Sequence, residues 1–581
     1  MPSEANKPAT QMKILCQKFH NWIRVKIQTD EITATLLLAL LCLFLYLPGI
    51  SSLPATDRDE SRYMQATKQM VATGNLVNIS FQDKPRYKKP VGIYWLQATF
   101  SRIAKQIGIA PTERSPYRLP STIGATSAVL FLYLGFRKIV GNLQSFCSAV
   151  LLACSLLIGV EAHLAKTDAM QLAAIVAMQA GLAQIYCFPK DHELLRARLF
   201  FWLGLGVALL IKGPVAPVLA LLTLAWICWK DRSISTVIKI QPWPWLLLPL
   251  ILIGPWLFSI QALSEGQFLR DSIQQDFLRK IVSGQESHGA PPGTYLLITP
   301  FLLWPTSWLL LPKAWEGLRR TSETLSRTTQ FLCGWLVPAW IVFELVPTKL
   351  PHYVLPLIPP LCLLAGIGIF QPDRLQDGPL LRLSKWPQRI GMFAWIASGL
   401  ALAIGVPLLS IWASGSITVA ALLIALGCIF SLLALKTIKT SKGQLYTSAL
   451  SAVVVFGLIF EAFLPNLNNL WPAKQIKLII DSNDFGTLPI AAASYQEPSL
   501  VFNLGTDTTL TDLHGIIQHA AKHPTSILIV ESNDVGKVRE QLSSYSNIYI
   551  LGTYSGFNYS KGKTINLSVL KSDWIKENNS S

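Results

Sequence analysis

Five charged residues fall within six positions directly after an apolar stretch that is typical of a membrane helix. They are Asp57, Arg58, Asp59, Glu60 and Arg62, and the apolar stretch before them runs to position 53. Carboxylates at a membrane boundary can orient an acceptor, remove a proton or bind a divalent cation, and guanidinium groups can bind a phosphate. This cluster is therefore the first candidate for a reactive site.

The segment 59–75 has the pattern of a helix that lies along the membrane surface. Asp59, Arg62 and Tyr63 share one face at helical spacing, and Gly74 is placed to end the helix. A carboxylate in the first turn is stabilised by the helix dipole. The alternative interpretation is an amphipathic interfacial helix whose acid serves only as a cap.

A group of cations follows this helix, just before an apolar stretch that opens at Pro90. Long basic side chains at this depth can simply extend to the lipid headgroups. The functional interpretation is a clamp for a phosphate held at the bilayer surface, where cations stabilise the charge of a leaving group. The cations are Lys84, Arg86, Lys88 and Lys89.

The composition is that of a membrane protein. Hydrophobic residues make up 51% of the 581 residues and charged residues only 14%, against about 25% in soluble domains. The net charge of +17 is spread over many short loops, so it indicates anionic lipid as the partner and argues against nucleic acid. None of the nine Cys residues falls in a CxxC pair, so we expect neither disulfides nor a zinc site.

Apolar runs long enough to cross a bilayer recur about thirteen times. The tail before the first run, 1–32, is rich in Lys and Arg, which places it in the cytoplasm. The loops 54–115 and 263–293 then lie outside, and so does every unusual polar stretch. The runs lie near 33–53, 116–136, 143–160, 168–187, 198–211, 214–229, 243–262, 294–312, 328–346, 353–370, 390–411, 416–435 and 446–464.

The pattern changes after about position 475, where short apolar runs alternate with helical patterns. "KLIID", "PIAAAS", "SLVFNLG", "SILIVES" and "IYILGTY" predict strands, and "TDLHGIIQHAAKH" and "DVGKVREQLSSY" predict helices. Residues 475–581 therefore predict a small external α/β domain, which has no Gly-rich phosphate loop.

Several motifs together resemble one enzyme family. "DESRY", "TGN", "KKP" and "YW" in the first external loop resemble the lipid A aminoarabinose transferases, which are bacterial members of the GT-C glycosyltransferase superfamily. "TKLPHYVLPLIPPL" resembles a later signature of that family, and "AKTDA" and "IKGPVAP" look like further elements. Protein O-mannosyltransferases are more distant relatives. The resemblance covers 33–465 in outline.

The resemblance implies a fold and a reaction. The fold is an α-helical polytopic GT-C protein of about thirteen transmembrane helices, with interfacial helices in the first periplasmic loop and a C-terminal periplasmic α/β domain. The enzyme would sit in the bacterial inner membrane with a periplasmic active site. It would transfer a sugar from an undecaprenyl-phosphate donor, without a nucleotide cofactor, to lipid A, lipopolysaccharide or another outer-face acceptor.

The resemblance also implies roles for single residues. Asp59 would act in catalysis as a metal ligand or as the group that orients the acceptor, with Glu60 and Arg62 beside it. Lys89 would bind the donor phosphate. The full set of predicted substrate-binding residues is Tyr63, Lys88, Lys89, Arg279, Lys280, Lys349, His352 and Tyr353.

A divalent cation would need a second carboxylate. Asp276 is the best partner for Asp59 as a metal ligand, because hard cations take carboxylate oxygens. Aminoarabinose transferases tend to carry a Glu-His pair near this position, whereas this chain has Gln275-Asp276, with Glu286 and His288 further on. This departure leaves both the metal and the acceptor open.

Three further charged residues have two interpretations each. Lys166 and Asp168 flank a predicted helix start and Lys212 precedes a break at "KGP", so they can be caps and interfacial charges or parts of the site. Two other functions also stay open. One is a protein O-mannosyltransferase-like enzyme, and the other is a glycolipid flippase or transporter, for which we expect charges in the middle of the membrane and repeated halves.

Overall fold

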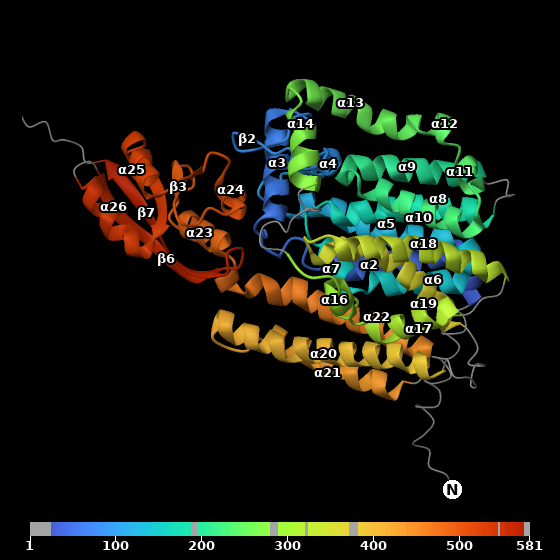
Figure 1. Ribbon diagram of the computed structural model, residues 1–581. Helices are drawn as coiled ribbons and strands as arrows, with labels where there is room; N and C mark the ends of the chain where they lie inside the picture. The colour runs from blue at the N-terminus through green and yellow to red at the C-terminus, as the bar shows by residue number, and fades with distance from the viewer. Residues whose placement is uncertain are drawn as a thin grey trace, which may run out of the picture.

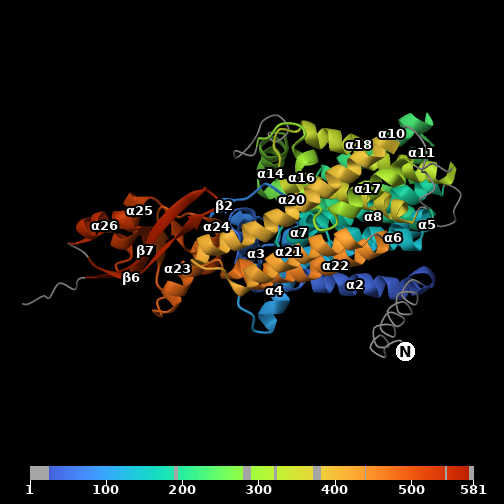
Figure 2. The ribbon, with the colours of Figure 1, turned by 90° about the horizontal axis from the view of Figure 1, so that it is seen from below.

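The structure is a computed structural model that describes residues 25–188, 194–278, 289–319, 323–370, 381–438, 440–543 and 546–574. It consists of a long helical bundle with a smaller C-terminal domain at one end (Figure 1). The domain lies at the same end in the view turned by 90° (Figure 2). We call this end of the bundle the domain end.

The bundle contains the long helices of the chain. The bounds of its main helices are α2 (Glu31–Tyr46), α5 (Ser115–Val140), α6 (Asn142–Ala153), α7 (Leu156–Ala162), α8 (Asp168–Cys187), α9 (Leu194–Lys212), α10 (Val215–Asp231), α13 (Leu247–Leu263), α16 (Thr294–Leu302), α17 (Ser307–Arg319), α18 (Glu323–Leu345), α19 (Ile358–Ile369), α20 (Leu381–Ser414), α21 (Val419–Thr437) and α22 (Ser441–Gly457). Shorter helical segments connect them: α11 (Ser235–Ile240), α12 (Pro242–Trp245), α14 (Gln267–Arg270), η2 (Asp271–Leu278), η3 (Pro351–Leu357) and η4 (Leu458–Phe463).

The predicted polytopic membrane fold is confirmed, and the number of about thirteen spans stays a prediction. Seven described helices are long and apolar enough to cross a bilayer, and counting each bent pair as one span raises the number to ten. Each of the thirteen predicted runs does contain a helix. The other three runs fall on α2 and α10, which are 16 and 17 residues long, and on α21, whose apolar part ends at Ala434.

Bundle helices approach one another closely where small residues meet. A Cβ atom on Gly317 of α17 would lie 2.0 Å from the Leu364 carbonyl oxygen of α19, and one on Gly368 would lie 2.1 Å from the Lys313 carbonyl oxygen. Van der Waals contact between backbones replaces the hydrophobic effect where both helices are surrounded by lipid. These two glycines therefore set the α17–α19 distance.

Two short helices and a hairpin cover the domain end of the bundle. They are α3 (Asp59–Thr73), α4 (Gly92–Gln106) and the antiparallel strands β1 (Ser80–Phe81) and β2 (Lys84–Pro85). The predicted helix with its Gly74 terminus is confirmed, because α3 begins at Asp59 and Gly74 adopts the left-handed conformation at φ 74°. Tyr63, Tyr94 and Trp256 belong to the apolar cluster beneath this layer.

The C-terminal domain is a five-stranded sheet between two pairs of helices. The strand order is β4-β3-β5-β7-β6, with β3 parallel to β4 and β5 and with β7 antiparallel to β5 and β6. Ile527 and Ile529 of β5 face α23 and α24, whereas Leu528 and Val530 face α25 and α26. The bounds are β3 (Ile490–Ala492), β4 (Thr509–Leu510), β5 (Ser526–Glu531), β6 (Ser546–Asn558), β7 (Lys563–Trp574), α23 (Pro472–Asp481), α24 (Pro498–Leu504), α25 (Leu513–Lys522) and α26 (Val535–Leu542).

Two of the predicted strands in this domain are wrong. "KLIID" lies in α23 and "SLVFNLG" lies in α24, and each helix carries a Pro in its first turn. Ala473, Ile476 and Ile480 of α23 are buried at helical spacing. Short apolar runs do not separate strand from helix by themselves, and the favourable N-terminal Pro was the missed signal.

Candidate active site

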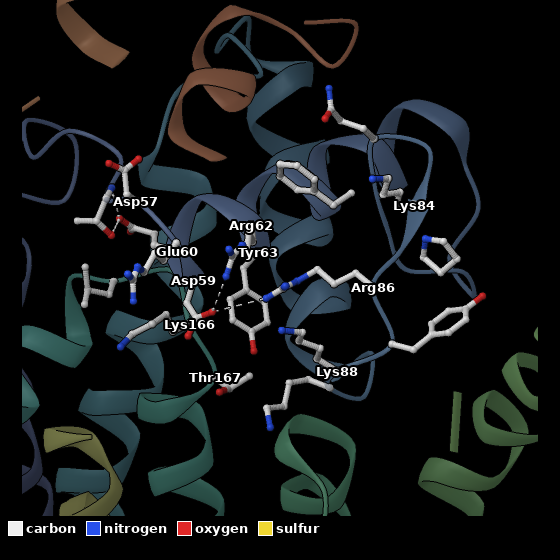
Figure 3. A pocket seen from close by; sticks show the side chains of 18 of the residues that line it. Asp57, Asp59, Glu60, Arg62, Tyr63, Lys84, Arg86, Lys88, Lys166 and Thr167 are labelled. Atoms are coloured by element: carbon white, nitrogen blue, oxygen red, sulfur yellow. Dashed lines mark hydrogen bonds and ion pairs between the residues drawn. The ribbon is translucent and has the colours of Figure 1, made fainter. Parts of the chain in front are cut away.

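A cavity of about 1560 Å³ opens at the domain end of the bundle. Figure 3 shows it from close by, with Asp59 near its centre. Its walls come from segments that are far apart in the sequence: 56–63, 81–89, the connection from α7 to α8, Lys212 at the end of α9, Asp271, the 348–353 segment and the 506–510 segment of the C-terminal domain.

Asp59 faces this cavity from the first turn of α3. Its Oδ1 lies 3.9 Å from Arg62 Nη1 and 3.8 Å from Arg86 Nη2. The carboxylate remains 56% exposed because it points into the open space. Burial opposes its ionisation, but the charges of Arg86 and Lys166 outweigh burial and hold the pKa of Asp59 below its usual value. Asp59 is therefore an ionised group at neutral pH.

The cavity wall around Asp59 is rich in cations, as predicted for the first loop. Arg86 is buried, with its guanidinium 5.3 Å from the centre of the Tyr63 ring. The predicted residues Arg62, Tyr63, Lys88, Lys89, His352 and Tyr353 all line the cavity, together with Lys84, Lys166 and Lys212. The structure thus brings two distant predicted motifs, 59–89 and 348–353, to one place.

A buried charge cluster joins these motifs, and we define it as Glu161, Lys166, Asp168, Lys212 and His352. Lys166 Nζ donates to Glu161 Oε1 at 3.0 Å, and Lys212 Nζ donates to Asp168 Oδ1 at 2.5 Å. The two ring nitrogens of His352 lie 4.0 Å from Glu161 Oε1 and 3.9 Å from Asp168 Oδ1. Charges that are taken out of water need such partners.

The cluster includes one residue to which the sequence analysis gave no function. Asp168, Lys166 and Lys212 line the cavity, and their function there stays a prediction. Glu161 was the missed member. Its signal in the sequence was a carboxylate inside an apolar run, five residues before a Lys. Burial alone would lower the pKa of Lys166, but the adjacent carboxylates outweigh it and raise that pKa, so the lysine stays charged.

Glu60 is held in a different way from Asp59. Its Oε1 accepts from Arg118 Nε at 2.8 Å and from the Ala165 N–H at 2.9 Å. Its Oε2 accepts from Arg118 Nη2 at 3.1 Å and from the Thr56 N–H and hydroxyl. Both side chains of the Glu60–Arg118 pair are completely buried. The geometry therefore leaves Glu60 with no oxygen to offer a substrate.

Lys349, predicted to bind the donor phosphate, does not line the cavity. Its Nζ donates to the carbonyl oxygens of Glu344 and Val346, both at 2.7 Å, where α18 ends. A cation at a helix C-terminus satisfies carbonyls that have no partner within the helix. The structure thus places Lys349 as a cap, and it leaves His352 and Tyr353 as the cavity residues of this motif.

The variant Lys349→Met is expected to lower the free energy of unfolding by about 1–3 kcal/mol, because two buried carbonyls lose a charged donor. Its KM for the donor should stay within about twofold of the wild type, since the side chain lies outside the cavity. Thermal unfolding in detergent and donor titration measure the two effects. A large increase in donor KM with unchanged stability would restore Lys349 to the phosphate site.

Part of the second predicted loop, 263–293, falls outside the described residues, which stop at 278 and resume at 289. Arg279, Lys280, Glu286 and His288 lie there, and of Asp276 only the backbone within η2 is described. Among the described residues, no group of three His, Cys, Asp or Glu side chains could hold a metal ion. Asp59, the other predicted ligand, instead contacts two arginines. The described residues thus do not form a metal site, and we derive no step through one.

The C-terminal domain also contributes to the cavity, which the sequence did not indicate. Gln496, the 506–510 segment and Tyr559 line one side of it. Asp57, just before α3, is buried against this domain, where its Oδ2 accepts from Tyr495 Oη at 3.1 Å. Burial, opposed by hydrogen bonds from Ser499 and Tyr495 and assisted by the nearby Glu497 carboxylate, raises the pKa of Asp57 to about 6.

The raised pKa of Asp57 makes the stability of this contact depend on pH. The Asp57 carboxyl has a pKa of 3.8 in the unfolded chain and of about 6 in the folded protein. Its ionisation therefore lowers the stability of the folded state progressively from about pH 4 to 6, and by the full amount above pH 6. Asp57→Asn removes the cost and still accepts from Tyr495. We expect it to raise the unfolding temperature by about 2–4 °C at pH 7.5 and by much less at pH 4.5. An equal shift at both pH values would contradict this assignment.

Comparison with known proteins agrees with the fold. Residues 88–258 match the family model described as dolichyl-phosphate-mannose-protein mannosyltransferase. An undecaprenyl phosphate-alpha-4-amino-4-deoxy-L-arabinose arabinosyl transferase of Pseudomonas fluorescens is 28% identical over 361 residues, which are 60% of this chain and 58% of that protein. One from Aeromonas hydrophila is 23% identical over 59% of this chain and 60% of that protein. The chain thus matches less than two thirds of the length of these relatives.

A solved structure extends the likeness over nearly the whole chain. The crystal structure of ArnT from Cupriavidus metallidurans bound to undecaprenyl phosphate superposes with a TM-score of 0.72 at 16% identity. The superposition covers 92% of this chain and 97% of that one. The apo state of the same protein gives a TM-score of 0.70. The fold predicted from the motifs, including the C-terminal domain, is therefore confirmed.

Proposed function

We propose that this chain, a multi-pass membrane protein with an ArnT-like fold, is a glycosyltransferase of the GT-C type that transfers a sugar from an undecaprenyl-phosphate donor to lipid A or lipopolysaccharide. The single observation that carries the proposal is the cavity at an end of the helical bundle in which the ionised and half-exposed carboxylate of Asp59 lies beside the cations Arg62 and Arg86. The donor carries a phosphate on a lipid tail that stays among the apolar helices. Cations at the end of the bundle would stabilise the charge of that phosphate.

We place the donor phosphate among Arg86, Lys88, Lys89 and Lys212. These side chains line one cavity wall, and Lys212 Nζ also lies 5.6 Å from the centre of the Tyr353 ring. As the bond between the anomeric carbon and the phosphate oxygen breaks, the electron pair stays on the polyprenyl phosphate. Nearby cations stabilise that charge without any proton transfer.

The acceptor oxygen forms the new bond to the anomeric carbon, and Asp59 is the group that we place beside it. A carboxylate whose pKa is lowered is a poor general base, because basicity falls with pKa. This favours an acceptor that is already ionised, such as a lipid A phosphate, over a sugar or protein hydroxyl. Asp59 would then stabilise the positive charge that develops on the sugar ring as the bond to the phosphate oxygen breaks. Glu60 holds the helix start and takes no part in the reaction.

We further propose that the cavity lies on the periplasmic side. The loops of the opposite side carry most of the Lys and Arg residues of the short loops, as the positive-inside rule requires of the cytoplasmic face. The C-terminal domain lies at the cavity end of the bundle (Figure 2). Labelling of single-Cys variants at exposed positions in the 107–112 loop and in the 232–234 loop of intact cells would test the two faces separately.

Transfer of a radiolabelled sugar from synthetic polyprenyl-phosphate donors by the purified protein in detergent tests the reaction. Aminoarabinose and hexose donors should each be offered with lipid A, with a Ser/Thr-rich peptide and with no acceptor. Transfer to lipid A supports the proposal, and transfer to the peptide would favour a mannosyltransferase-like activity. Absence of transfer combined with donor movement across vesicle membranes would instead indicate a flippase. Parallel reactions with EDTA test the predicted metal at Asp59 and Asp276.

A further inference from the structure

The C-terminal domain binds the two residues that precede Asp59. The Asp57 N–H donates to Tyr559 Oη at 2.6 Å, and Tyr495 Oη donates to Asp57 Oδ2 at 3.1 Å. The Arg58 guanidinium donates to the Ser560 carbonyl oxygen. Three hydrogen bonds thus tie the start of α3 to a domain that lies more than 400 residues away in the sequence.

The backbone at this point adopts a conformation that the local sequence does not favour. Arg58 has φ 63° and ψ −112°, a region that residues with a Cβ rarely occupy. No side chain caps the N-terminus of α3. Such a conformation persists when surrounding structure over-determines it, and here the surrounding contacts come from the C-terminal domain.

The residue after Asp59 is anchored from the opposite side. Glu60 is held in the buried pair with Arg118 of α5, so it follows the helical bundle. Asp59 therefore lies between an anchor on the C-terminal domain and an anchor on the bundle. Among the residues that the structure describes, its own carboxylate makes only the two long contacts with arginines, so its position depends on the backbone around it.

The same domain also holds the hairpin beside Arg86. Gln82 Nε2 donates to the carbonyl oxygens of Thr506 at 3.0 Å and of Thr508 at 2.7 Å. Gln65 Nε2 of α3 donates to Thr506 Oγ1 at 2.8 Å. One segment of the domain therefore contacts both the helix that carries Asp59 and the hairpin that leads to Arg86.

We infer that the C-terminal domain contributes to the active site. Its residues Tyr559 and Tyr495 are positioning residues that hold the Asp59 carboxylate next to Arg86 in the cavity. The inference rests on the proposed transfer reaction and extends it, because it gives the domain a function in the chemical step. A displacement of about 1 Å at a reacting group can cost a hundredfold in rate. Loss of one anchor should therefore reduce turnover without removing any group to which the proposed function gives a contact with the donor or the acceptor.

The test uses three variants of the full-length protein that each lose one hydroxyl. Tyr559→Phe and Tyr495→Phe remove anchors of Asp57. Tyr554→Phe is the matched control, because its hydroxyl lies in the same domain but donates to the Asn468 carbonyl oxygen at 3.0 Å, away from the cavity. We expect both anchor variants to lose about tenfold in kcat with donor KM within about twofold, and the control to keep both values.

Hydrogen–deuterium exchange supplies a readout that needs no activity. The amides of 57–62 should exchange faster in both anchor variants than in Tyr554→Phe, at matched unfolding temperatures. Anchor variants that match the control in kcat and in exchange would overturn the inference. If the wild type transfers no sugar, the proposed function fails, whereas faster exchange confined to 57–62 would still support the positioning of Asp59 by the domain.

Discussion

Replacement of Asp59 by Asn is expected to lower kcat for sugar transfer by about 10²–10⁴-fold. The substitution keeps the shape of the side chain and removes the negative charge that the site maintains against burial. Stability should change little, because the contacts of Asp59 with Arg62 and Arg86 are long, at 3.9 and 3.8 Å, and the side chain is half exposed. Turnover of a labelled donor and thermal unfolding in detergent measure the two quantities.

A matched control distinguishes the effect of losing the Asp59 charge from the effect of losing any other acidic residue in the same loop. Glu113 lies in the same loop, pairs with Arg114 at 3.7 Å and does not line the cavity, so Glu113→Gln should keep full activity. Retention of full turnover by Asp59→Asn would remove Asp59 from the mechanism. Because its pKa is lowered, the contribution of Asp59 should persist down to a pH below 3.8 and be lost only as the pH falls through the folded value.

The largest expected loss of stability follows from Glu60→Gln. Burial opposes ionisation of Glu60, but the adjacent Arg118 outweighs it and lowers the pKa of Glu60. The neutral variant leaves the completely buried guanidinium without its counter-charge, which costs about 3–5 kcal/mol. We expect a much lower unfolding temperature and a low yield of folded protein, measured by fluorescence-detected gel filtration after heating.

The double variant Glu60→Gln/Arg118→Met tests whether the uncompensated charge is the cause. Replacement of both partners also removes the buried guanidinium charge that the single variant leaves without a counter-charge. The double variant should therefore unfold at a higher temperature than Glu60→Gln. A single variant as stable as the wild type would show that water or another group satisfies Arg118. Recovered stability with recovered activity would also confirm that Glu60 does not react.

The residues around the cavity show which features of the candidate site the sequence alone could predict. The helical face of Asp59 and Tyr63 and the stop at Gly74 follow from local spacing, and the structure reproduces them. The cations of the 84–89 segment are concentrated at one predicted membrane boundary, and the structure places them in the cavity wall, where a phosphate clamp stays a prediction. The partners of Glu60 and Lys349 could not be predicted in this way. A charged residue next to a reactive one has the same sequence signature whether it faces the cavity or a buried partner.

By itself, the sequence determined that this is a polytopic membrane protein, where most of its helices begin and end, and which motifs are candidates for a common site. Those properties follow from hydrophobicity and from spacing within a few residues. Only the tertiary structure decided that Glu161, Lys212 and His352 meet in one charge cluster. It also decided that Arg118 forms an ion pair with Glu60 and that Tyr559 Oη accepts a hydrogen bond from the Asp57 N–H. These pairings join segments up to about 500 residues apart, and their stability depends on the burial of both partners, a property that no local pattern records.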